Sequence, residues 1–257
     1  MSQPPPTAPT VSVCMATHNG LRYLADQIST ILPQLGDADE VVVVDDASTD
    51  GTREFLEKLS DPRVRFIPLP NNVGYVRAFE RALNESHNDL LLLSDQDDEW
   101  LPGRVQAMRA GLVSSQVVAG NLTTLGGPGS IPGPYGQRAW RLDPAASTRR
   151  WRNTLGILAG NRPYFGSAMG LRREALAVVL PFPEHLRESH DLWIALCGIT
   201  LASMTHLREC VTARRYHESN ATPLRPRKLA SVLRARLLLL RLVGDASTRT
   251  RVAKARR

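Results

Sequence analysis

The stretch EVVVVDDASTDGTREFLE, residues 40–57, decides the fold class of this 257-residue chain. Its four consecutive valines, Val41 to Val44, form a short β-branched run that is typical of a strand buried on both faces of a sheet. Two carboxylates, Asp45 and Asp46, follow where that strand should end, and the loop then leads into a segment with helical spacing. The stretch therefore predicts a strand, a polar loop at its carboxyl end and a helix.

The same stretch also fits the spacing of a calcium-binding EF-hand loop. The matching positions are Asp46, Ser48, Asp50, Gly51 and Glu57. An EF-hand needs a helix before its loop, whereas four valines precede this one. We therefore interpret the loop as the end of a strand that opens onto a ligand site, with Asp50 or Thr52 as the cap of the following helix.

The preceding and following segments repeat this alternation of strand and helix. Short apolar runs predict further strands at residues 10–16, 63–69 and 88–94. Helical spacing of apolar residues predicts helices at residues 21–35, 52–59 and 73–86. The alternation predicts an α/β fold with a mostly parallel sheet flanked by helices, whose ligands bind at the carboxyl ends of the strands.

Polar residues follow three of these strands, at residues 17–20, 45–46 and 94–100. The run Asp95-Gln96-Asp97-Asp98 is the strongest signal, because carboxylates this close repel one another unless a cation or a donor offsets their charge. Oxygen ligands on a short loop suit Mg²⁺ or Mn²⁺, particularly when substrate phosphates share the cation. The alternative is a solvated turn before a helix.

The second half of the chain offers fewer signals. Residues 121–150 are rich in Gly and Pro, which predicts a long loop, and we interpret it as a lid over the site. Residues 165–176 predict a small-residue strand that enters a helix. Asp191 precedes an apolar helix, so it either caps or favourably charges the N-terminus of that helix, or it acts in the site. His217 lies in a polar run, where a structural core histidine is less expected.

Composition limits the class of protein. Hydrophobic residues make up 42% and charged residues 22% of the chain, as in ordinary globular proteins. Neither a signal peptide nor a membrane-spanning run of ~20 apolar residues is recognisable. The three cysteines are Cys14, Cys197 and Cys210. Their odd number and wide spacing predict free thiols in a reducing compartment, and hence a cytoplasmic protein.

The net charge of +7 is concentrated in the last residues of the chain. Residues 221–257 carry 11 Lys or Arg and one acid, which leaves a net charge of −3 on residues 1–220. This distribution predicts no nucleic-acid-binding face on the main domain. The run KLASVLRARLLLLRLV at 228–243 predicts an amphipathic helix that either lies on an anionic membrane surface or packs on the domain.

Several quoted motifs, in their order, resemble family 2 glycosyltransferases. They are VSVCMATHNG, EVVVVDDASTDGT, NNVGYVRAFERAL and LLLSDQDDEW. The later segments GSAMGLRREAL, HDLW and RYHESN are similar to the rhamnosyltransferase-type branch. The resemblance implies a GT-A fold over residues 10–222, with a nucleotide-sugar half at 10–120 and an acceptor and catalytic half at 121–222. The sequence outside it predicts a disordered lead-in at 1–9 and a basic amphipathic segment at 223–257.

The resemblance also implies roles for individual residues of this chain. The nucleotide-sugar-binding set would be Ala16, Thr17, His18, Asn19, Asp46, Ser48, Arg77, Asp95 and Gln96, with Arg77 near the diphosphate. Asp97, Asp95 and His217 would hold Mg²⁺ or Mn²⁺. Asp191 would be the catalytic base. One departure concerns the late motif, where Arg214 occupies the place of a usual tyrosine and weakens the His217 assignment.

The implied activity is the inverting transfer of a sugar from a nucleoside-diphosphate donor, with dTDP-rhamnose favoured by resemblance. The implied acceptor is a glycan or lipid-linked glycan of cell-surface polysaccharide synthesis, reached from the inner face of the cell membrane. A nucleotidyltransferase is the enzymatic alternative, although residues 17–20 supply no basic phosphate loop. A receiver-like signalling domain would be about half this length, and a binding-only relative of the transferases is the remaining alternative.

Overall fold

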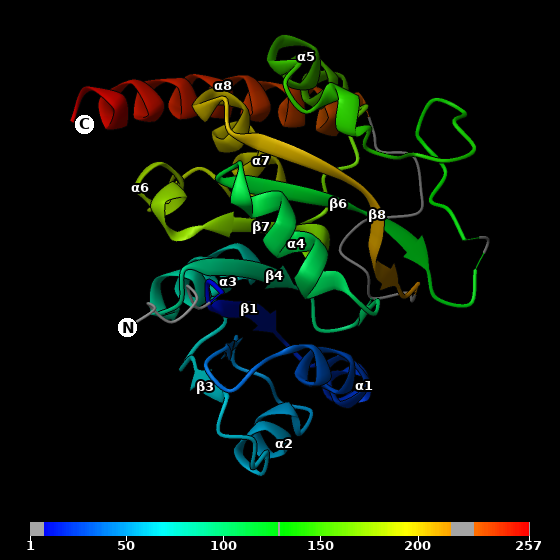
Figure 1. The fold of residues 1–257 in the computed structure, drawn as a ribbon, viewed down its shortest axis with the longest axis vertical. Coiled ribbons are helices and arrows are strands. Elements are labelled where there is room, and N and C mark those ends of the chain that lie inside the picture. Colours follow the sequence, from blue (N-terminus) through cyan, green and yellow to red (C-terminus); the bar gives the residue numbers. More distant parts are fainter. Residues whose placement is uncertain (1–7, 128, 217–228, 257) are drawn as a thin grey trace, which may run out of the picture.

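The computed structural model describes residues 8–127, 129–216 and 229–256. Within them the chain forms an eight-stranded sheet with the strand order β3-β2-β1-β4-β7-β6-β8-β5 (Figure 1). The strands are β1 Val11–Thr17, β2 Glu40–Asp45, β3 Val64–Pro68, β4 Leu90–Ser94, β5 Glu99–Trp100, β6 Val117–Thr124, β7 Met169–Arg172 and β8 Met204–Arg214. The strands β1 to β4 are mutually parallel, as the sequence predicts. In the rest of the sheet, β7 is antiparallel to β4 and β6, and β5 is antiparallel to β8. The strands β6 and β8 are parallel.

Helices cover both faces of this sheet. They are α1 Leu21–Ile31, α2 Thr52–Glu57, α3 Tyr75–Glu85, α4 Arg104–Val113, α5 Arg150–Ala159, α6 Leu176–Val179, α7 His190–Leu201 and α8 Leu229–Ala255. One face of β2, with Val41 and Val43, packs under α1, α2 and α4, while Val42 and Val44 face α3 and α7. Successive side chains of a strand point to opposite faces of the sheet. All four valines are fully buried because helices cover both faces. The predicted α/β architecture is confirmed.

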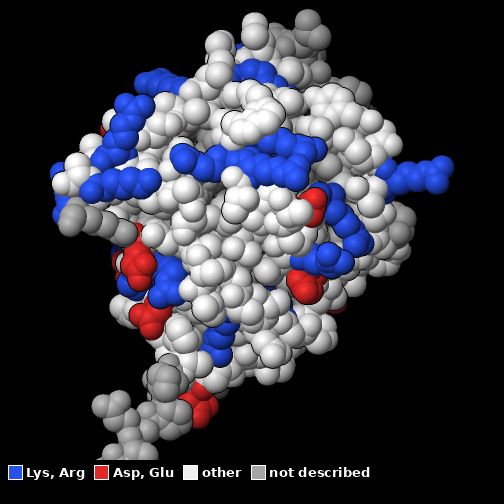
Figure 2. Space-filling view, turned by 45° about the horizontal axis from the view of Figure 1, so that its top comes forward, with Lys and Arg blue, Asp and Glu red and all other residues white. Residues whose placement is uncertain are grey.

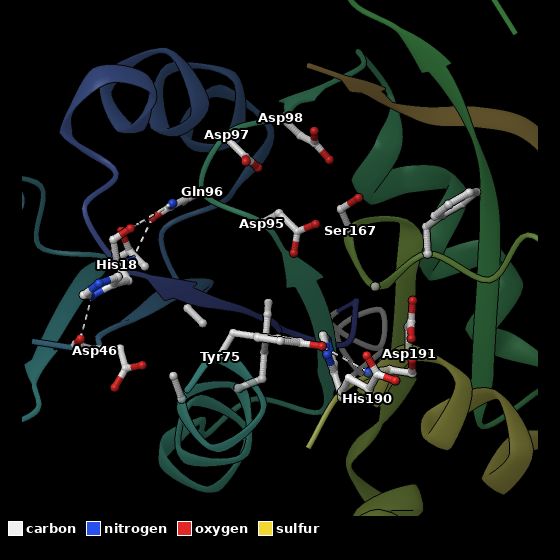
Figure 3. Close-up of a pocket in the computed structure, with 18 of the residues that line it drawn as sticks. His18, Asp46, Tyr75, Asp95, Gln96, Asp97, Asp98, Ser167, His190 and Asp191 are labelled. Carbon is white, nitrogen blue, oxygen red and sulfur yellow. Dashed lines mark hydrogen bonds between the residues drawn. The ribbon is translucent and has the colours of Figure 1, made fainter. Parts of the chain in front are cut away.

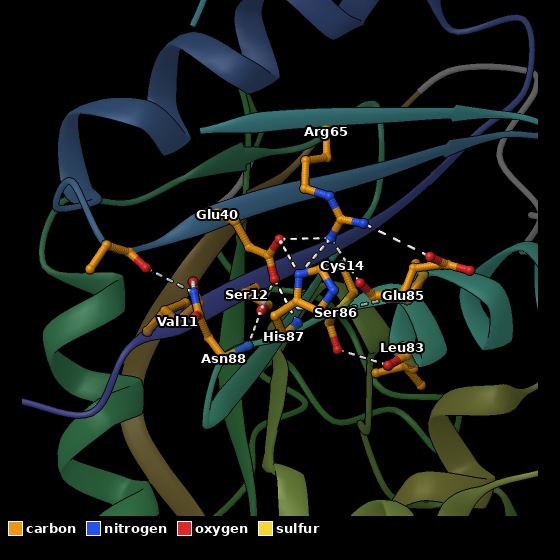
Figure 4. Close-up of polar contacts among 12 residues, drawn as sticks. Val11, Ser12, Cys14, Glu40, Arg65, Leu83, Glu85, Ser86, His87 and Asn88 are labelled. Atoms are coloured by element: carbon orange, nitrogen blue, oxygen red, sulfur yellow. Dashed lines mark hydrogen bonds and ion pairs between the residues drawn. The ribbon is translucent and has the colours of Figure 1, made fainter. Parts of the chain in front are cut away.

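A buried carboxylate fixes the amino ends of the strands (Figure 4). Glu40 at the start of β2 accepts hydrogen bonds from the Ser12 hydroxyl at 2.6 Å, the His87 backbone N–H at 2.7 Å and the Arg65 guanidinium at 2.9 Å. Burial acts to raise the pKa of Glu40, but these donors together lower it below its usual range. This network joins β1, β2, β3 and the segment before β4 at the edge opposite the polar loops.

Two predictions for the second half need correction. The loop predicted at 121–150 begins later, because β6 continues to Thr124 and pairs with β8 on both sides of a register shift near Asn121. The amide of Asn121 anchors the remaining loop, since its Oδ1 accepts a hydrogen bond from the Leu142 N–H at 2.7 Å. Leu142 and Ile131 are buried. The action of this loop as a lid stays a prediction.

The basic segment forms the long helix α8, which extends well beyond the predicted 228–243. Its residues Leu239, Leu242 and Ala246 are buried against the main domain, where α8 contacts α5, α6 and α7. The Thr250 hydroxyl lies 2.9 Å from that of Thr200 in α7. Packing of this segment on the domain is therefore observed, and a membrane contact of its exposed side stays a prediction. No helix of the described residues is both long and apolar enough to cross a membrane.

Candidate active site

A pocket of about 300 Å³ opens at the carboxyl ends of β1, β2 and β4 (Figure 3). Its other walls come from α3, from the start of α7 and from the 3₁₀ turn Gly166–Ala168 that precedes β7. Eight of the residues implied by the family resemblance line it: Ala16, Thr17, His18, Asp46, Asp95, Gln96, Asp97 and Asp191. Segments that are far apart in sequence therefore meet at the edge of the sheet where the strand pattern predicts a ligand site.

The side chain of Gln96 joins the loops after β1 and β4. Its Oε1 accepts hydrogen bonds from the Thr17 hydroxyl at 2.5 Å and the His18 N–H at 2.8 Å, and its Nε2 donates to the His18 carbonyl at 3.1 Å. Gly20 makes this approach possible, because a Cβ there would lie 2.3 Å from Oε1 of Gln96. The two loops consequently form one unit.

Asp46, at the end of β2, binds backbone rather than another side chain. Its carboxylate accepts hydrogen bonds from the N–H groups of Val73 and Gly74, at 2.7 and 2.9 Å, immediately before α3. Its carbonyl lies 2.8 Å from Nδ1 of His18. Asp46 therefore fixes three segments of the pocket rim while one side of it still faces the pocket.

Asn19, Ser48 and Arg77 do not line the pocket. The Ser48 hydroxyl hydrogen bonds to Asp45 and accepts from the Asn19 N–H at 2.8 Å, while Oδ1 of Asn19 accepts from the Thr49 N–H at 2.8 Å. These contacts hold the loops that carry the lining residues.

Arg77 is not among the residues that line the pocket, and its predicted place near a diphosphate stays a prediction. Its guanidinium donates to the carbonyls of Phe182, Pro183 and Glu184, at 2.9 to 3.2 Å, and to Glu80 at 2.6 Å. These acceptors hold the side chain against the segment before α7 and away from the pocket. His217, another predicted site residue, lies outside the described residues.

The loop after β4 gathers three carboxylates within a few ångströms (Figure 3). One oxygen from each of Asp95, Asp97 and Asp98 lies within 4.8 Å of the others. Burial, followed by the charges of Asp98 and Asp97, raises the pKa of Asp95 well above its usual range. Burial and the charge of Asp97 raise the pKa of Asp98 to about 6. This crowding of hard oxygen ligands fits a divalent cation, whose charge would offset the repulsion.

A buried arginine that the sequence analysis did not single out, Arg104, packs beside this loop and donates hydrogen bonds to backbone carbonyls near it. Arg104, at the start of α4, is 1% exposed, and its guanidinium lies 3.9 Å from the ring centroid of Trp100. It donates to the carbonyls of Leu93 and Ser167, the former at 2.7 Å. Burial lowers the pKa of Arg104 to about 9, so it stays cationic at neutral pH. No pattern in the sequence distinguishes this arginine from the many exposed ones.

The opposite wall carries Asp191 in the first turn of α7. Its carboxylate accepts a hydrogen bond from the Leu192 N–H at 2.7 Å. Burial raises the pKa of Asp191 to about 6. A carboxylate with a pKa near neutrality is suited to take up a proton in catalysis. Ser189 occupies the N-cap position, but Asp191 lies in the first turn of α7, where its charge also favours the helix N-terminus, so its role as a base stays a prediction.

An aromatic group lies beside Asp191, and the sequence analysis missed its members. The His190 ring stacks on Phe79 with centroids 4.3 Å apart, and Tyr75 meets it edge-on at 5.6 Å. Burial lowers the pKa of His190 to about 4, so the ring is neutral at pH 7. Among the described residues, neither of its ring nitrogens has a hydrogen-bond partner. A buried, unpaired ring that borders a pocket is available to a ligand.

Arg214, at the end of β8, is the only Lys or Arg among the described residues that line the pocket. Its guanidinium lies 5.6 Å from the ring centroid of Phe165 and 5.5 Å from that of Tyr216. Its charge acts to lower the pKa values of Asp95, Asp98 and Asp191, against the effect of burial. The sequence marked this arginine only as a departure from a family motif, yet it supplies positive charge to an acidic pocket.

Comparisons with known proteins agree with this geometry. The family model "Glycosyl transferase family 2" matches residues 12–178. The chain is 32% identical over 100 residues to the putative teichuronic acid biosynthesis glycosyltransferase TuaG of Bacillus subtilis, covering 38% of this chain and 40% of that protein. It is 34% identical over 116 residues to the succinoglycan biosynthesis protein ExoO of Rhizobium meliloti, covering 44% and 33%. It is 27% identical over 217 residues to the uncharacterized glycosyltransferase alr2836 of Nostoc, covering 82% and 66%.

These matches span between a third and two thirds of the length of the relatives. Among solved structures, TarS residues 1–349 of S. aureus in complex with UDP-GlcNAc superposes with a TM-score of 0.66 at 19% identity, covering 93% of this chain and 72% of that one. The complex of TarS residues 1–349 with UDP gives 0.64, also at 19% identity, covering 90% and 65%. At this level of identity the similarity concerns the fold, and it confirms the predicted GT-A architecture.

Proposed function

This chain belongs to glycosyl transferase family 2, and from that premise we propose that it transfers a sugar from a nucleoside diphosphate to a hydroxyl group of a glycan, with inversion at the anomeric carbon. One observation carries the proposal. A single pocket holds a carboxylate with a raised pKa, Asp191, and a group of three carboxylates at the end of β4. Inverting transfer needs a base for the acceptor and charge stabilisation for the leaving group.

The donor nucleotide would bind over the loops that Gln96 and Asp46 hold together. Ala16, Thr17 and His18 line the pocket there and would contact the base and ribose. Asn19 and Ser48 would contribute indirectly by fixing these loops. The solved complexes of TarS with UDP and UDP-GlcNAc support a nucleoside diphosphate as the donor.

Asp95 and Asp97 would hold Mg²⁺ or Mn²⁺, with Asp97 as a direct ligand and His217 as a further predicted one. The three-carboxylate cluster fits such a cation because its oxygens lie close enough to share it. When bound, the cation would neutralise charge that develops on the departing diphosphate. Arg104 beneath the loop would keep these carboxylates in place.

Asp191 would act as the general base. The acceptor hydroxyl would give its proton to the Asp191 carboxylate while the acceptor oxygen bonds to the anomeric carbon. The bond from that carbon to the diphosphate oxygen would break on the opposite side, so the nucleoside diphosphate leaves with the electron pair. A positioned base of this kind typically contributes ~10²–10⁴-fold to the rate.

For the donor we favour dTDP-rhamnose. The support for this choice is the resemblance of the segments GSAMGLRREAL, HDLW and RYHESN to the rhamnosyltransferase-type branch. The printed functions of relatives, in teichuronic acid and succinoglycan biosynthesis, support a cell-surface polysaccharide or its lipid-linked precursor as the acceptor. The site of action would be the inner face of the cell membrane.

The test is a thermal-shift panel of UDP-, dTDP- and GDP-sugars, each with Mn²⁺ and with EDTA, followed by a transfer assay with the donor that binds. A ligand that binds only the folded state raises the melting temperature, and 100-fold excess over Kd corresponds to ~2.7 kcal/mol. We expect Mn²⁺-dependent stabilisation by one donor, with dTDP-rhamnose the first candidate. Stabilisation without turnover would favour a binding-only relative, and no stabilisation by any donor would contradict the proposal.

A further inference from the structure

The helices α5 and α8 together form an exposed surface along one edge of the molecule (Figure 1). We call it the α5–α8 face and define it by its apolar side chains, Trp151, Leu155, Leu233, Leu237 and Leu240. The two helices touch, and the Arg236 guanidinium of α8 donates to the Ala159 carbonyl at the end of α5, at 2.9 Å. Their exposed sides therefore belong to one continuous surface.

The exposed leucines of α8 are separate from the face that packs on the domain. Leu233, Leu237 and Leu240 recur at spacings of four and three residues, which places them in one stripe of the helix. They are 62%, 59% and 54% exposed, whereas Leu239 and Leu242 on the opposite side are buried. The helix α8 is thus apolar on two sides, and only one of them packs on the described residues of the domain.

The exposed residues of α5 extend this stripe. Trp151 is 72% exposed and Leu155 is 56% exposed, and they are four residues apart on the outer side of α5. Tryptophan and leucine together are typical of the apolar side of helices that lie in a membrane interface. Isolated exposed hydrophobic residues need no explanation, but five on two touching helices form a patch.

Basic side chains surround this patch. Figure 2 shows Lys and Arg gathered over the upper part of the molecule, with few acidic side chains among them. The exposed basic residues of the two helices and the residue before α5 are Arg149, Arg150, Arg152, Arg234, Arg241, Arg251 and Lys254. One acid, Asp245, lies in α8, and its carboxylate lies 3.1 Å from Nε2 of His185. A membrane surface that contains anionic lipids matches both the apolar patch and its positive rim.

We propose that the α5–α8 face docks the protein on an anionic lipid bilayer, with the leucines and Trp151 in the interface and the arginines at the headgroups. Each basic residue near such a surface strengthens binding roughly fivefold. Docking through this face needs no transfer reaction, so it can be tested whether or not the proposed activity is found.

The fold connects this face to the pocket through α7. The first turn of α7 carries Asp191, and the far side of the same helix packs on α8. Arg249 of α8 lies over the Trp193 ring of α7, 5.1 Å from its centroid. A bilayer bound at the α5–α8 face would thus lie at a fixed distance from the pocket.

Vesicle flotation of the full chain tests the proposal. We expect at least tenfold stronger partitioning to vesicles of 30% phosphatidylglycerol in phosphatidylcholine than to phosphatidylcholine alone, with a loss at high salt. The variant Leu233→Gln/Leu237→Gln/Leu240→Gln should weaken partitioning by roughly 10- to 100-fold. The variant Arg234→Gln/Arg241→Gln/Arg251→Gln should weaken it by about 100-fold.

Matched controls separate the surface from net charge and from stability. The variant Arg53→Gln/Lys58→Gln/Arg81→Gln removes the same charge from exposed positions of the helical segments around α2 and α3, and Val113→Gln removes an apolar side chain that is 80% exposed on α4. Both should partition within about threefold of the unmodified chain. All variants should melt within a few degrees of it.

Three results would overturn the proposal. The first is equal or absent binding to the two kinds of vesicle. The second is an equal loss of binding in the α5–α8 charge variant and its control, since net charge alone would then explain the attraction. The third is a dimer in solution that the leucine variant converts to a monomer, because the face would then bind a second copy of the chain.

Discussion

The ends of β2 and β4 lie at the same edge of the sheet and both carry adjacent acidic residues, yet the surroundings of their carboxylates differ. At the end of β2, Asp46 accepts two backbone N–H groups and Asp45 is bonded to Ser48. At the end of β4, no described group donates a hydrogen bond to the Asp95 carboxylate, and the charges of Asp97 and Asp98 act on it instead.

This difference separates a structural use of aspartate from a functional one. A carboxylate that is satisfied by backbone donors stabilises the fold around it. Carboxylates that crowd one another destabilise the ligand-free protein, and such a cluster persists where a cation or substrate relieves it. The β2 end therefore builds the rim, whereas the β4 end is expected to bind the ligand.

The largest effect is expected for a substitution of Asp191, which faces the end of β4 across the pocket. Asp191→Asn should lower kcat by ~10²–10⁴-fold, because the acceptor loses its base, and donor affinity should stay within about threefold. Steady-state kinetics and calorimetry with the donor give both values. The matched control is Glu188→Gln, a second carboxylate of the same pocket, for which we expect less than a fivefold change. Full turnover by the Asp191 variant would remove it from the mechanism.

A smaller effect is expected from the cluster itself. Asp97→Ala should abolish the Mn²⁺ dependence of donor binding and weaken that binding by roughly 100-fold, because a direct ligand of the cation is lost. Calorimetric titration of the donor, with Mn²⁺ and with EDTA, measures this. If the variant still binds the donor more tightly with Mn²⁺ than without it, the cation is held elsewhere.

The two strand ends should differ most clearly in stability, because replacing Asp by Asn should change the free energy of unfolding in opposite directions at the two ends. Asp46→Asn should lower the free energy of unfolding by ~1–3 kcal/mol, because an amide N–H₂ would face a buried backbone N–H. Asp95→Asn should raise it by ~1 kcal/mol in the presence of EDTA, because it removes one of three crowded charges. Chemical denaturation measures both, and equal signs would end the distinction between the two strand ends.

The smallest effect is a pH dependence. The base must be ionised, and the pKa of Asp191 is about 6, so kcat/KM should fall as pH drops below 6 and level off above it. The decline should approach ~10-fold per pH unit below the pKa. An unchanged kcat/KM between pH 7.5 and 5 would contradict this role of the carboxylate.

The sequence predicts the first part of the molecule better than the second. Val41 to Val44 and the runs around them have the composition of doubly buried strands, and the polar residues after them could be placed at one edge of the sheet from topology alone. By contrast, β6 was not predicted, and its last residues, Asn121 to Thr124, lie in the segment whose Gly and Pro content predicted a loop. Its pairing with β8 depends on contacts about ninety residues apart.

The residues of the site also differ in how well the sequence predicts them. Asp95, Asp97 and Asp191 could be expected at the pocket because their motifs are local, and they do line it. The positions of His190 and Arg104 could not, since burial and stacking depend on helices that meet only in the folded chain. For Arg77 a family motif predicts a place near the diphosphate, and the sequence could not show that backbone carbonyls far along the chain bind its guanidinium.

The amide of Gln96 has a thermodynamic consequence. Because its three hydrogen bonds join the loop that would meet the nucleotide to the loop that carries the carboxylate cluster, an ordering of one loop is transmitted to the other. Binding of nucleotide and of cation should then be cooperative even where the two do not touch. Such a coupling is reciprocal, so that each ligand would raise the affinity of the other by the same factor.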